Sequence, residues 1–336
     1  MRNRPSVLIL ESMYHPAGEK LLANEADLNV LRDATDETIT AAIADASAVF
    51  VRYPCKLKGD AIRAGKDVLV ISTSGRGTDA IDIEAAIKSG IAVVNNPGLG
   101  SIPVSEHTLG LMLEFAKQIS SSNMAIRAGG GFGEGHLSTR FHLEGRTIGV
   151  IGCGQIGAEV VRKCTVGFGM RALVYDPYIE PAAAAKVGGI WMEELNDMLS
   201  KCDFVSVHAE LTEETHSMVN ENFLRQMRFN SYLLNTARGP IVEQAALLRA
   251  LEEKWIAGAA LDVFETEPLP LDSPLFAYDN LVMTPHIGGL TIEAREELSL
   301  SAANQILQVL RGERPPHLVN EDVWGHVQER LQNRSF

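Results

Sequence analysis

The sequence predicts an α/β fold made of two doubly wound domains, each built on a parallel sheet. Short apolar segments alternate with helix-like segments over residues 1–100, and the same alternation returns over residues 147–289. Such alternation is typical of parallel sheets with helices on both faces. A glycine-rich turn at residues 152–157 joins an apolar strand to a helix, as in the doubly wound domains that bind dinucleotides.

Length and composition narrow the class of protein. A chain of 336 residues suggests two domains, each with its own core. No apolar run approaches the ~20 residues of a membrane span. The apolar run Val7–Leu10 is too short for a signal peptide, so we expect a cytoplasmic protein without membrane contact. A net charge of −13 argues against a nucleic-acid surface.

The cysteine pattern predicts neither disulfides nor a metal site. The four cysteines form no C-x-x-C pair, and no histidine cluster has the spacing of metal ligands. Cys153 occupies a variable position of the glycine-rich turn, where nothing in the sequence indicates oxidation. Reduced and mostly buried cysteines are therefore expected, at positions 55, 153, 164 and 202.

The first region is expected to form five strands with helices between them. Ligands of parallel sheets bind at the carboxyl ends of strands, and two loops at such ends stand out. One contains Arg52, and the glycines of the other, residues 72–79, could expose backbone N–H groups to an anion. A plain surface turn explains either loop equally well. The predicted strands are 7–10, 28–30, 48–51, 68–71 and 91–94, and the helices 16–23, 36–44, 58–64 and 82–89.

A turn and a long helix lead into the second domain. Asn95–Gly98 is a strong turn signal, and a helical pattern runs from Val104 to about Ile119. We place the domain boundary near Ser101. Residues 128–135 are too rich in glycine for regular structure and are expected to be a loop, or an arm that contacts another subunit.

The glycine-rich turn has the parts that a dinucleotide site needs. Gly152 permits the tight turn, Gly154 lets the backbone approach a pyrophosphate, and Gly157 allows close helix packing. The helix itself is expected from Ala158 to about Phe168. Asp176 ends the next apolar strand; it can accept both ribose hydroxyls and would repel a 2′-phosphate, so NAD is favoured over NADP. An ordinary glycine-rich βα turn is the alternative.

Polar residues follow most of the later predicted strands, so chemistry should gather at the carboxyl edge of the second sheet. A helix from Thr291 to Arg311 could then carry the chain back to the first domain, and the tail after it looks helical. The later strands are 205–207, 232–235, 259–261 and 281–283, and the residues past their ends include His208, Thr236–Gly239, Asp262 and His286.

Three residues of this edge form a candidate catalytic set. An arginine such as Arg238 can clamp a carboxylate with two parallel hydrogen bonds. A histidine such as His286 can give or take the proton of an alcohol, and a carboxylate such as Glu267 can fix its tautomer. Beside a nicotinamide, the set would support hydride transfer to a 2-keto acid. Taken singly, a surface arginine, a packed histidine and a helix-flanking glutamate are the alternatives.

The motifs around these residues resemble the D-isomer-specific 2-hydroxyacid dehydrogenases over nearly the whole chain. The resemblance is carried by motifs in the family's order: Ser74-Gly-Arg-Gly-Thr-Asp79, Val104-Ser-Glu-His107, His208 with Leu211-Thr212 and Glu214-Thr215, Asn235-Thr-Ala-Arg-Gly239, Asp262 to Pro268, and Pro285-His-Ile-Gly-Gly289.

The resemblance implies a role for each residue of the site. Arg238 would hold the substrate carboxylate and polarise its keto oxygen. His286 would be the general acid in reduction and the base in oxidation, and Glu267 would keep it protonated until catalysis. The backbone at Ser74, Gly75, Arg76 and Gly77 would bind the other side of the carboxylate. NAD would be bound by Gly152, Gly154, Gln155, Ile156, Gly157, Asp176, His208, Thr212, Thr236, Ala237, Asp262 and Gly288.

The resemblance also implies an architecture and an assembly. A flavodoxin-like substrate domain would comprise residues 1–100 and 290–336, and a Rossmann NAD-binding domain residues 101–289. Substrate binding would close the domains and exclude water. A homodimer would form through the nucleotide domain and the arm around residues 102–145.

Several positions depart from the family pattern. Gln155 stands where an arginine is common, which removes a charge from the pyrophosphate, and Glu210 replaces a common proline. Arg76 stands where a small or apolar residue is usual, and Arg52 corresponds to a substrate-side arginine of phosphoglycerate dehydrogenases. The two arginines suggest a dianionic substrate, phosphorylated or dicarboxylic; the alternative is that Arg76 faces solvent.

Two classes of function remain open. The first is an oxidoreductase that oxidises 3-phosphoglycerate or reduces hydroxypyruvate or glyoxylate. A form without a C-terminal regulatory domain is expected, because the chain stops soon after residue 311. Formate dehydrogenases carry glutamine where Glu267 stands and match less well. The second class is a non-catalytic NAD-responsive scaffold of the co-repressor type.

Overall fold

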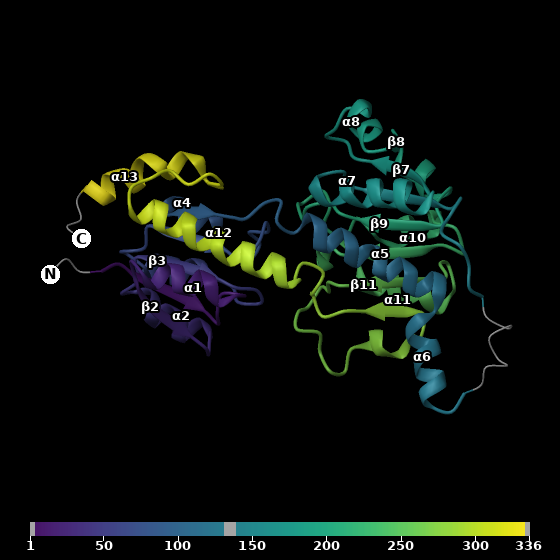
Figure 1. Cartoon of the computed structure of the whole chain (residues 1–336), viewed down its shortest axis with the longest axis horizontal. Coiled ribbons are helices and arrows are strands. Elements are labelled where there is room, and N and C mark those ends of the chain that lie inside the picture. The colour runs from purple at the N-terminus through teal and green to yellow at the C-terminus, as the bar shows by residue number, and fades with distance from the viewer. Residues whose placement is uncertain (1–3, 131–138, 333–336) are drawn as a thin grey trace. The chain divides into compact units, whose positions relative to one another are not determined.

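The computed structural model describes residues 4–130 and 139–332 and divides into two compact units. The first comprises Met1–Gly100 with Leu290–Phe336, and the second comprises Ser101–Gly289 (Figure 1). Both are α/β units with a wholly parallel sheet, which confirms the predicted fold class. Residues 131–135 of the expected glycine-rich arm lie outside the described residues.

The five strands of the first unit follow the order β2-β1-β3-β4-β5, and neighbours pair in parallel. This is the flavodoxin-like order, with its switch point between β1 and β3. Each strand lies within about two residues of its predicted position, because buried parallel strands are continuous apolar runs. The strands are β1 (Ser6–Leu10), β2 (Asp27–Leu31), β3 (Ala48–Val51), β4 (Val70–Thr73) and β5 (Ala92–Val94).

Helices cover both faces of this sheet and divide its core in two. Val7 and Ile9 of β1 belong to one hydrophobic cluster, and Leu8 and Leu10 to the other, as the alternation of a strand requires. The first cluster is completed by α1 (Pro16–Ala23), α12 (Ile292–Leu310) and α13 (Trp324–Gln332), and the second by α2 (Asp36–Ile43), α3 (Gly59–Ala64) and α4 (Ile83–Lys88).

The second unit has a seven-stranded parallel sheet in the order β12-β11-β10-β9-β6-β7-β8. The strand order reverses between β6 and β9, where doubly wound domains bind their ligands. One strand, β8, was not predicted. The strands are β6 (Thr147–Ile151), β7 (Arg171–Tyr175), β8 (Gly189–Trp191), β9 (Phe204–Val207), β10 (Tyr232–Asn235), β11 (Gly258–Leu261) and β12 (Leu281–Met283).

Helices again line both faces of this sheet. One cluster is built with α5 (Ser101–Lys117), α7 (Gln155–Arg162) and α8 (Pro181–Lys186), and the other with α9 (Leu195–Leu199), α10 (Glu221–Gln226) and α11 (Gln244–Glu252). The sequence placed the start of α7 at Ala158, but it begins at Gln155, because Gly154 is its extended N-cap. After Arg162 the helix passes into a π-helical turn, Lys163–Gly167.

The long helix predicted from Val104 to about Ile119 is α5, which runs from Ser101 to Lys117. Gln118 adopts a left-handed conformation, with φ of +54°, and separates α5 from a further helix, α6 (Ile119–Arg127). The carboxylate of Glu114 accepts hydrogen bonds from the backbone and hydroxyl of Ser120 and so stabilises the start of α6. Figure 1 shows α6 extending beyond the body of the second unit, and none of its residues is buried.

Candidate active site

The glycine-rich turn connects β6 to α7 and has the close backbone approaches that glycine allows. Gly152 has φ of +84°, and a Cβ there would lie 2.8 Å from the backbone nitrogen of Ala209. A Cβ on Gly157 would lie 2.0 Å from the carbonyl oxygen of Gly152. A Cβ on Gly154 would meet nothing within 4 Å. The turn therefore leaves open space at Gly154, beside the first turn of α7, and helix N-termini commonly bind phosphate groups.

Asp176, at the end of β7, ties two loops of this region together. One carboxylate oxygen accepts a hydrogen bond from the backbone of Cys153 at 2.8 Å, and the other accepts one from the backbone of Tyr178 at 2.9 Å. The carboxylate is half-buried and lies against the glycine-rich turn. This is the position from which a carboxylate can accept hydrogen bonds from a ribose.

The loop after β9 lies across the sheet's switch point from β7. The phenol of Tyr178 donates a hydrogen bond to the carboxylate of Glu214 in this loop, and that bond raises the pKa of Tyr178. Thr212 is exposed and hydrogen-bonds Thr215 within the same loop, both through its hydroxyl and through its backbone. A side-chain contact thus joins the loop after β7 to the loop after β9.

His208 begins the same loop, and its imidazole is neutral. Its Nε2 lies 2.8 Å from the hydroxyl of Ser206. Its Nδ1 is buried and has no hydrogen-bond partner in residues 4–130 and 139–332. Burial lowers the pKa of His208 to about 4, because a charged ring would lose its hydration. His208 can therefore serve as a neutral donor or acceptor.

Arg238 lies in a tight turn directly after β10. The buried side chain of Asn235 holds the turn, since its amide donates to the carbonyl of Arg238 at 2.9 Å and its oxygen accepts from the backbone of Ala237 at 3.0 Å. A Cβ on Gly239 would lie 1.8 Å from the carbonyl oxygen of Phe264. Only glycine allows this approach, which brings the Arg238 turn against the loop that carries Glu267.

Glu267 and His286 form a direct pair. The Nδ1 of His286 lies 2.8 Å from one carboxylate oxygen of Glu267. The other oxygen accepts a hydrogen bond of 2.6 Å from the backbone of Phe264. Glu267 is therefore fixed by its own loop while it orients the imidazole.

The three candidate catalytic residues follow neighbouring strands. β10, β11 and β12 pair in register, with Asn235 opposite Leu261 and Leu261 opposite Met283. Arg238, Glu267 and His286 come from the loops after these strands and therefore share the carboxyl edge of the sheet, as the sequence predicted for these loops.

Two residues of the predicted cofactor set are already engaged within the second unit. Asp262 is buried, and its carboxylate accepts hydrogen bonds from Thr284 and from the backbone of Ile287 and Gly288. Thr236 is also buried, and its hydroxyl lies 3.1 Å from that of Thr108 on α5. Sequence reasoning gave no role to the α5 residues; the Val104–His107 motif was their only signal.

Arg52, at the carboxyl edge of the first sheet, is held from two sides. Its guanidinium donates a hydrogen bond of 2.6 Å to the hydroxyl of Ser12 and lies 4.8 Å from the centre of the Tyr14 ring. Its Nε is buried and lacks a hydrogen-bond partner among the residues that the structure describes. A buried donor of this kind usually has a partner, so the arginine has capacity for an anion.

The second loop of this edge follows β4. The carbonyl oxygen of Gly75 accepts hydrogen bonds from the hydroxyl of Thr73 at 2.6 Å and from the backbone of Asn96 at 2.9 Å. The carbonyl of Arg76 accepts one from the side chain of Asn95. These bonds fix the loop from Ser74 to Gly77, while the side chain of Arg76 is exposed.

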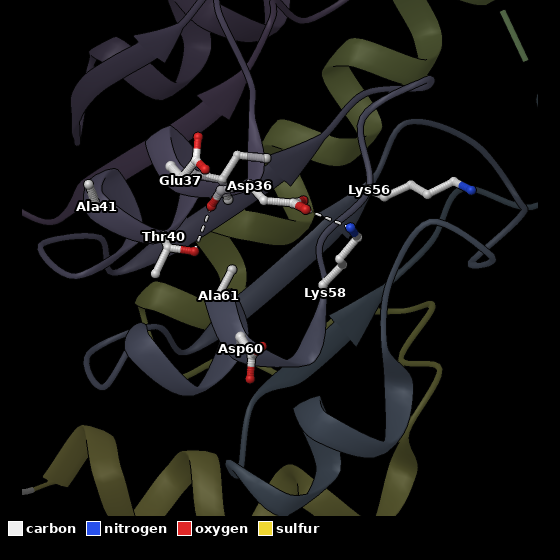
Figure 2. A pocket seen from close by; sticks show the side chains of 9 residues that line it. Asp36, Glu37, Thr40, Ala41, Lys56, Lys58, Asp60 and Ala61 are labelled. Atoms are coloured by element: carbon white, nitrogen blue, oxygen red, sulfur yellow. Dashed lines mark hydrogen bonds and ion pairs between the residues drawn. The ribbon is translucent and has the colours of Figure 1, made fainter.

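A surface pocket of about 500 Å³ also lies in the first unit, between α2 and α3. Figure 2 shows the carboxylate of Asp36 paired with Lys58 across it, at 2.6 Å. None of the predicted site residues lines this pocket. Its charged side chains, three carboxylates and two lysines, are exposed to solvent, and we assign it no role.

The described part of the chain gives two further negative findings. No helix in it is long and apolar enough to cross a membrane. No group of three or more histidine, cysteine, aspartate or glutamate side chains in it is arranged to hold a metal ion.

Comparisons with known proteins identify the family. Residues 109–288 match the model of the D-isomer specific 2-hydroxyacid dehydrogenase NAD binding domain. The glyoxylate reductase of Thermofilum pendens is 38% identical over 327 residues, which cover 95% of this chain and 96% of that protein. The chain belongs to the D-isomer specific 2-hydroxyacid dehydrogenase family. It is therefore an oxidoreductase with a nucleotide-binding domain of that family.

Other relatives include a longer protein and an NADPH-dependent reductase. The D-3-phosphoglycerate dehydrogenase of Methanocaldococcus jannaschii is 37% identical over 313 residues, which cover 93% of this chain but 59% of that protein. A solved NADPH-dependent glyoxylate/hydroxypyruvate reductase from Sinorhizobium meliloti, in complex with NADP and malonate, superposes with a TM-score of 0.83. It is 25% identical, and the match covers 95% of this chain and 98% of that one.

Proposed function

We propose that the protein transfers a hydride between NAD and C2 of a D-2-hydroxy acid or its 2-keto acid. The observation that carries the proposal is the hydrogen bond between His286 and Glu267, beside the turn that holds Arg238. When NAD is bound, its nicotinamide supplies or accepts the hydride. The groups of this chain then have to hold the acid and move one proton.

His286 is proposed as the general acid in reduction and the general base in oxidation. Because its Nδ1 donates to the carboxylate of Glu267, Nε2 is the nitrogen that exchanges a proton with the substrate oxygen. Glu267 keeps the ring oriented and balances its positive charge. The guanidinium of Arg238 is proposed to bind the substrate carboxylate through two parallel hydrogen bonds and to polarise the keto oxygen.

NAD rather than NADP is proposed as the cofactor. The carboxylate of Asp176 would repel a 2′-phosphate, and the nearby loop adds the acidic side chain of Glu214. We propose that the turn from Gly152 to Gly157 binds the pyrophosphate, and that Ala237, Gly288 and the neutral His208 lie along the nicotinamide half. The Sinorhizobium meliloti relative uses NADPH, so the preference has to be measured.

The substrate is proposed to be glyoxylate, hydroxypyruvate or 3-phosphoglycerate, with the first unit as the substrate domain. Glyoxylate reductases and a phosphoglycerate dehydrogenase are among the relatives. The buried, unsatisfied Nε of Arg52 supports a second anionic group on the substrate. If so, Arg52→Gln will lower kcat/KM for 3-phosphoglycerate at least about tenfold more than for glycerate. Equal losses of kcat/KM for both acids would contradict contact between Arg52 and a second anionic group of the substrate.

Arg76 gives a second test of the dianion. Its side chain is exposed, and the test asks whether it contacts a second anionic group of the substrate or faces solvent. Arg76→Ala is compared with wild type on glycerate and 3-phosphoglycerate. A selective loss with the phosphorylated acid supports contact, whereas an equal, small effect on both leaves Arg76 facing solvent.

A homodimer is proposed through the second unit, with α6 in the interface. Ile119, Met124 and Ile126 are 58%, 63% and 54% exposed on this helix, and large exposed apolar side chains gathered on one element commonly mark interfaces. Light scattering after gel filtration should give twice the chain mass for wild type. Met124→Glu with Ile126→Glu should give the monomer; a variant that stays dimeric would remove α6 from the interface.

Turnover of a substrate panel tests the function as a whole. Purified protein is mixed with NADH or NADPH and with glyoxylate, hydroxypyruvate, pyruvate or phosphohydroxypyruvate, and absorbance at the nicotinamide band is followed. His286→Gln should reduce kcat by about 10²- to 10⁴-fold, as general acids usually contribute. Tight NADH binding without turnover of any acid would instead favour the co-repressor type of scaffold.

A further inference from the structure

The loop that carries His286 is held from α5. We propose that His107, on α5, is a positioning residue that acts through Thr284 and Asp262 to fix the backbone at His286. The inference rests on the proposed function, because His286 is the proposed general acid. His107 contacts the His286 loop at Thr284 and at the backbone of Gly288, so its effect is transmitted through the loop.

A hydrogen-bonded chain connects the three residues. The Nε2 of His107 lies 2.9 Å from the hydroxyl of Thr284, and that hydroxyl lies 2.6 Å from a carboxylate oxygen of Asp262. A threonine hydroxyl has one proton, and Thr284 donates it to the carboxylate. His107 must then be the donor to Thr284, so its Nε2 carries a proton. The direction of the chain is therefore fixed from α5 toward Asp262.

The carboxylate of Asp262 in turn holds the backbone of the His286 loop. One of its oxygens accepts from the backbone of Ile287 at 2.9 Å, and the other accepts from the backbone of Gly288 at 2.8 Å. Burial alone would raise the pKa of Asp262, but His107, whose Nε2 also lies 3.5 Å from the carboxylate, lowers it together with the hydrogen bonds from Thr284 and the two backbone groups. The carboxylate is thus charged and buried, and each of its two oxygens accepts hydrogen bonds.

The backbone that this network holds is in an uncommon conformation. His286 has φ of +52°, the left-handed region that residues other than glycine rarely adopt. Its backbone nitrogen donates to the carbonyl oxygens of Asp262 at 2.8 Å and of Thr284 at 3.0 Å. Such a conformation persists only where surrounding contacts determine it. The contacts found here come from the two residues to which His107 is linked.

Packing supports the same link. A Cβ added to Gly288 would lie 3.3 Å from Cδ2 of His107 and 2.9 Å from the carboxylate of Asp262. The imidazole of His107 therefore lies directly against the loop backbone, two residues after His286. Its side chain is 21% exposed, so most of the ring is enclosed by this packing.

The adjacent residue of α5 makes a parallel contact. The hydroxyl of Thr108 lies 3.1 Å from that of Thr236, which precedes Arg238 by two residues. His107 and Thr108 of α5 thus contact the loops after β12 and β10, respectively. α5 also packs against α7, the helix that follows the glycine-rich turn. A shift of His107 would consequently alter the His286 loop without a contact to the reacting atoms.

The test compares three variants with a matched control. His107→Phe keeps a ring of similar size but removes the donor, and Thr284→Val keeps the shape but removes the hydroxyl. His107→Gln restores an N–H close to the position of Nε2. His142→Phe is the control, because His142 is exposed on the same unit and lies outside the site. Thr284→Val also covers the case in which His107→Phe does not fold.

Amide hydrogen exchange of the unliganded protein measures directly how firmly the backbone of the His286 loop is held. The backbone N–H groups of Ile287 and Gly288 should exchange at least about tenfold faster in His107→Phe and Thr284→Val than in wild type, because they are protected by Asp262. His107→Gln and His142→Phe should exchange like wild type. Unchanged exchange in both disrupted variants would overturn the inference.

Kinetics separates positioning from a general loss of structure. We expect kcat for 2-keto acid reduction to fall about tenfold or more in His107→Phe and Thr284→Val, with the Kd for NADH within about threefold of wild type. His107→Gln should recover most of kcat. A rise in KM with unchanged kcat would contradict a positioning role for His107. So would a kcat of His107→Gln that stays as low as that of His107→Phe. If wild type reduces no 2-keto acid while exchange still responds, the proposed function fails and the restraint on the loop stands.

Discussion

His286 adopts a left-handed backbone conformation, and its imidazole Nδ1 lies 2.8 Å from the carboxylate of Glu267. The two residues come from loops after neighbouring strands, and each loop is fixed by hydrogen bonds of its own. The pair is therefore held in place by hydrogen bonds of the chain itself. Preorganisation of this kind lowers the reorganisation that the reaction would otherwise require.

Glu267→Gln should lower kcat by about 10²-fold, because an oriented acid–base pair contributes on that order. The amide oxygen can still accept from the backbone of Phe264, so the loop should remain in place. The amide N–H₂ would then face Nδ1 of His286 and favour the wrong tautomer. The variant is compared with wild type and with Glu296→Gln, an exposed position on α12. A loss below twofold would show that the carboxylate is dispensable.

Asp176→Ala should relax the preference for NADH over NADPH. The ratio of kcat/KM for the two cofactors is expected to shift by about tenfold or more, because removal of the carboxylate removes the repulsion of a 2′-phosphate. Asp176→Asn tests charge alone, since an amide oxygen can still accept from the backbone of Cys153. An unchanged ratio in both variants would assign the preference to other residues.

Gln155→Arg should tighten NADH binding by about five- to tenfold, because the added charge would lie at the first turn of α7 beside the pyrophosphate. The gain should shrink as salt is added. Gln226→Arg, on an exposed turn of α10, carries the same charge away from the site. Fluorescence titration gives the Kd of each protein; equal tightening in both variants would point to a nonspecific charge effect.

Stability should fall between pH 6.5 and pH 4 through His208. Its pKa in the folded chain is about 4, below the ordinary 6.5. In that window the unfolded chain binds the proton that the folded chain excludes, so stability rises with pH. The contribution is on the order of 3 kcal/mol across the window. Urea unfolding at pH 7 and pH 4.5 measures it, and His208→Gln should lose that part of the pH dependence. If the free energy of unfolding falls equally in wild type and His208→Gln, groups other than His208 cause the pH dependence.

Cys153 should react slowly with alkylating agents despite its place in the glycine-rich turn. Burial, together with the charge of Asp176, raises the pKa of Cys153 to about 11. At pH 7.5 its reaction with iodoacetamide should be about a hundredfold slower than that of glutathione, because the thiolate reacts. Mass spectrometry of native and urea-unfolded protein follows the modification. Native reaction at the rate of glutathione would show an activated thiol.

Strand positions were predictable wherever an apolar run is long enough to span a buried sheet. β3, β10 and β12 have the predicted bounds. The edge strand β8 has only three residues, starts with Gly189 and is partly exposed, so its apolar run is too short to predict a strand. The start of α7 was misplaced because Gln155 and Gly157 read as turn residues, although Gly154 alone is the N-cap.

The site was predictable as far as its residues lie in compact motifs. The pairing of His286 with Glu267 follows from two loops on adjacent strands. The link from His107 to Thr284 joins residues 177 positions apart, and no local pattern reports such a contact. The buried state of the Asp262 carboxylate is equally a product of tertiary closure, since its donors come from α5 and from a later loop.

The returning helix α12 has a consequence for the order of folding. The face of the first sheet that carries Val7 and Ile9 is covered by Ala302 and Ile306 from the other end of the chain. During synthesis, this apolar face stays uncovered until the whole second unit has left the ribosome, because α12 follows that unit in the chain. Contacts so distant in sequence form slowly and leave apolar surface exposed in the meantime. The unit that is synthesised first is thus the last to be completed.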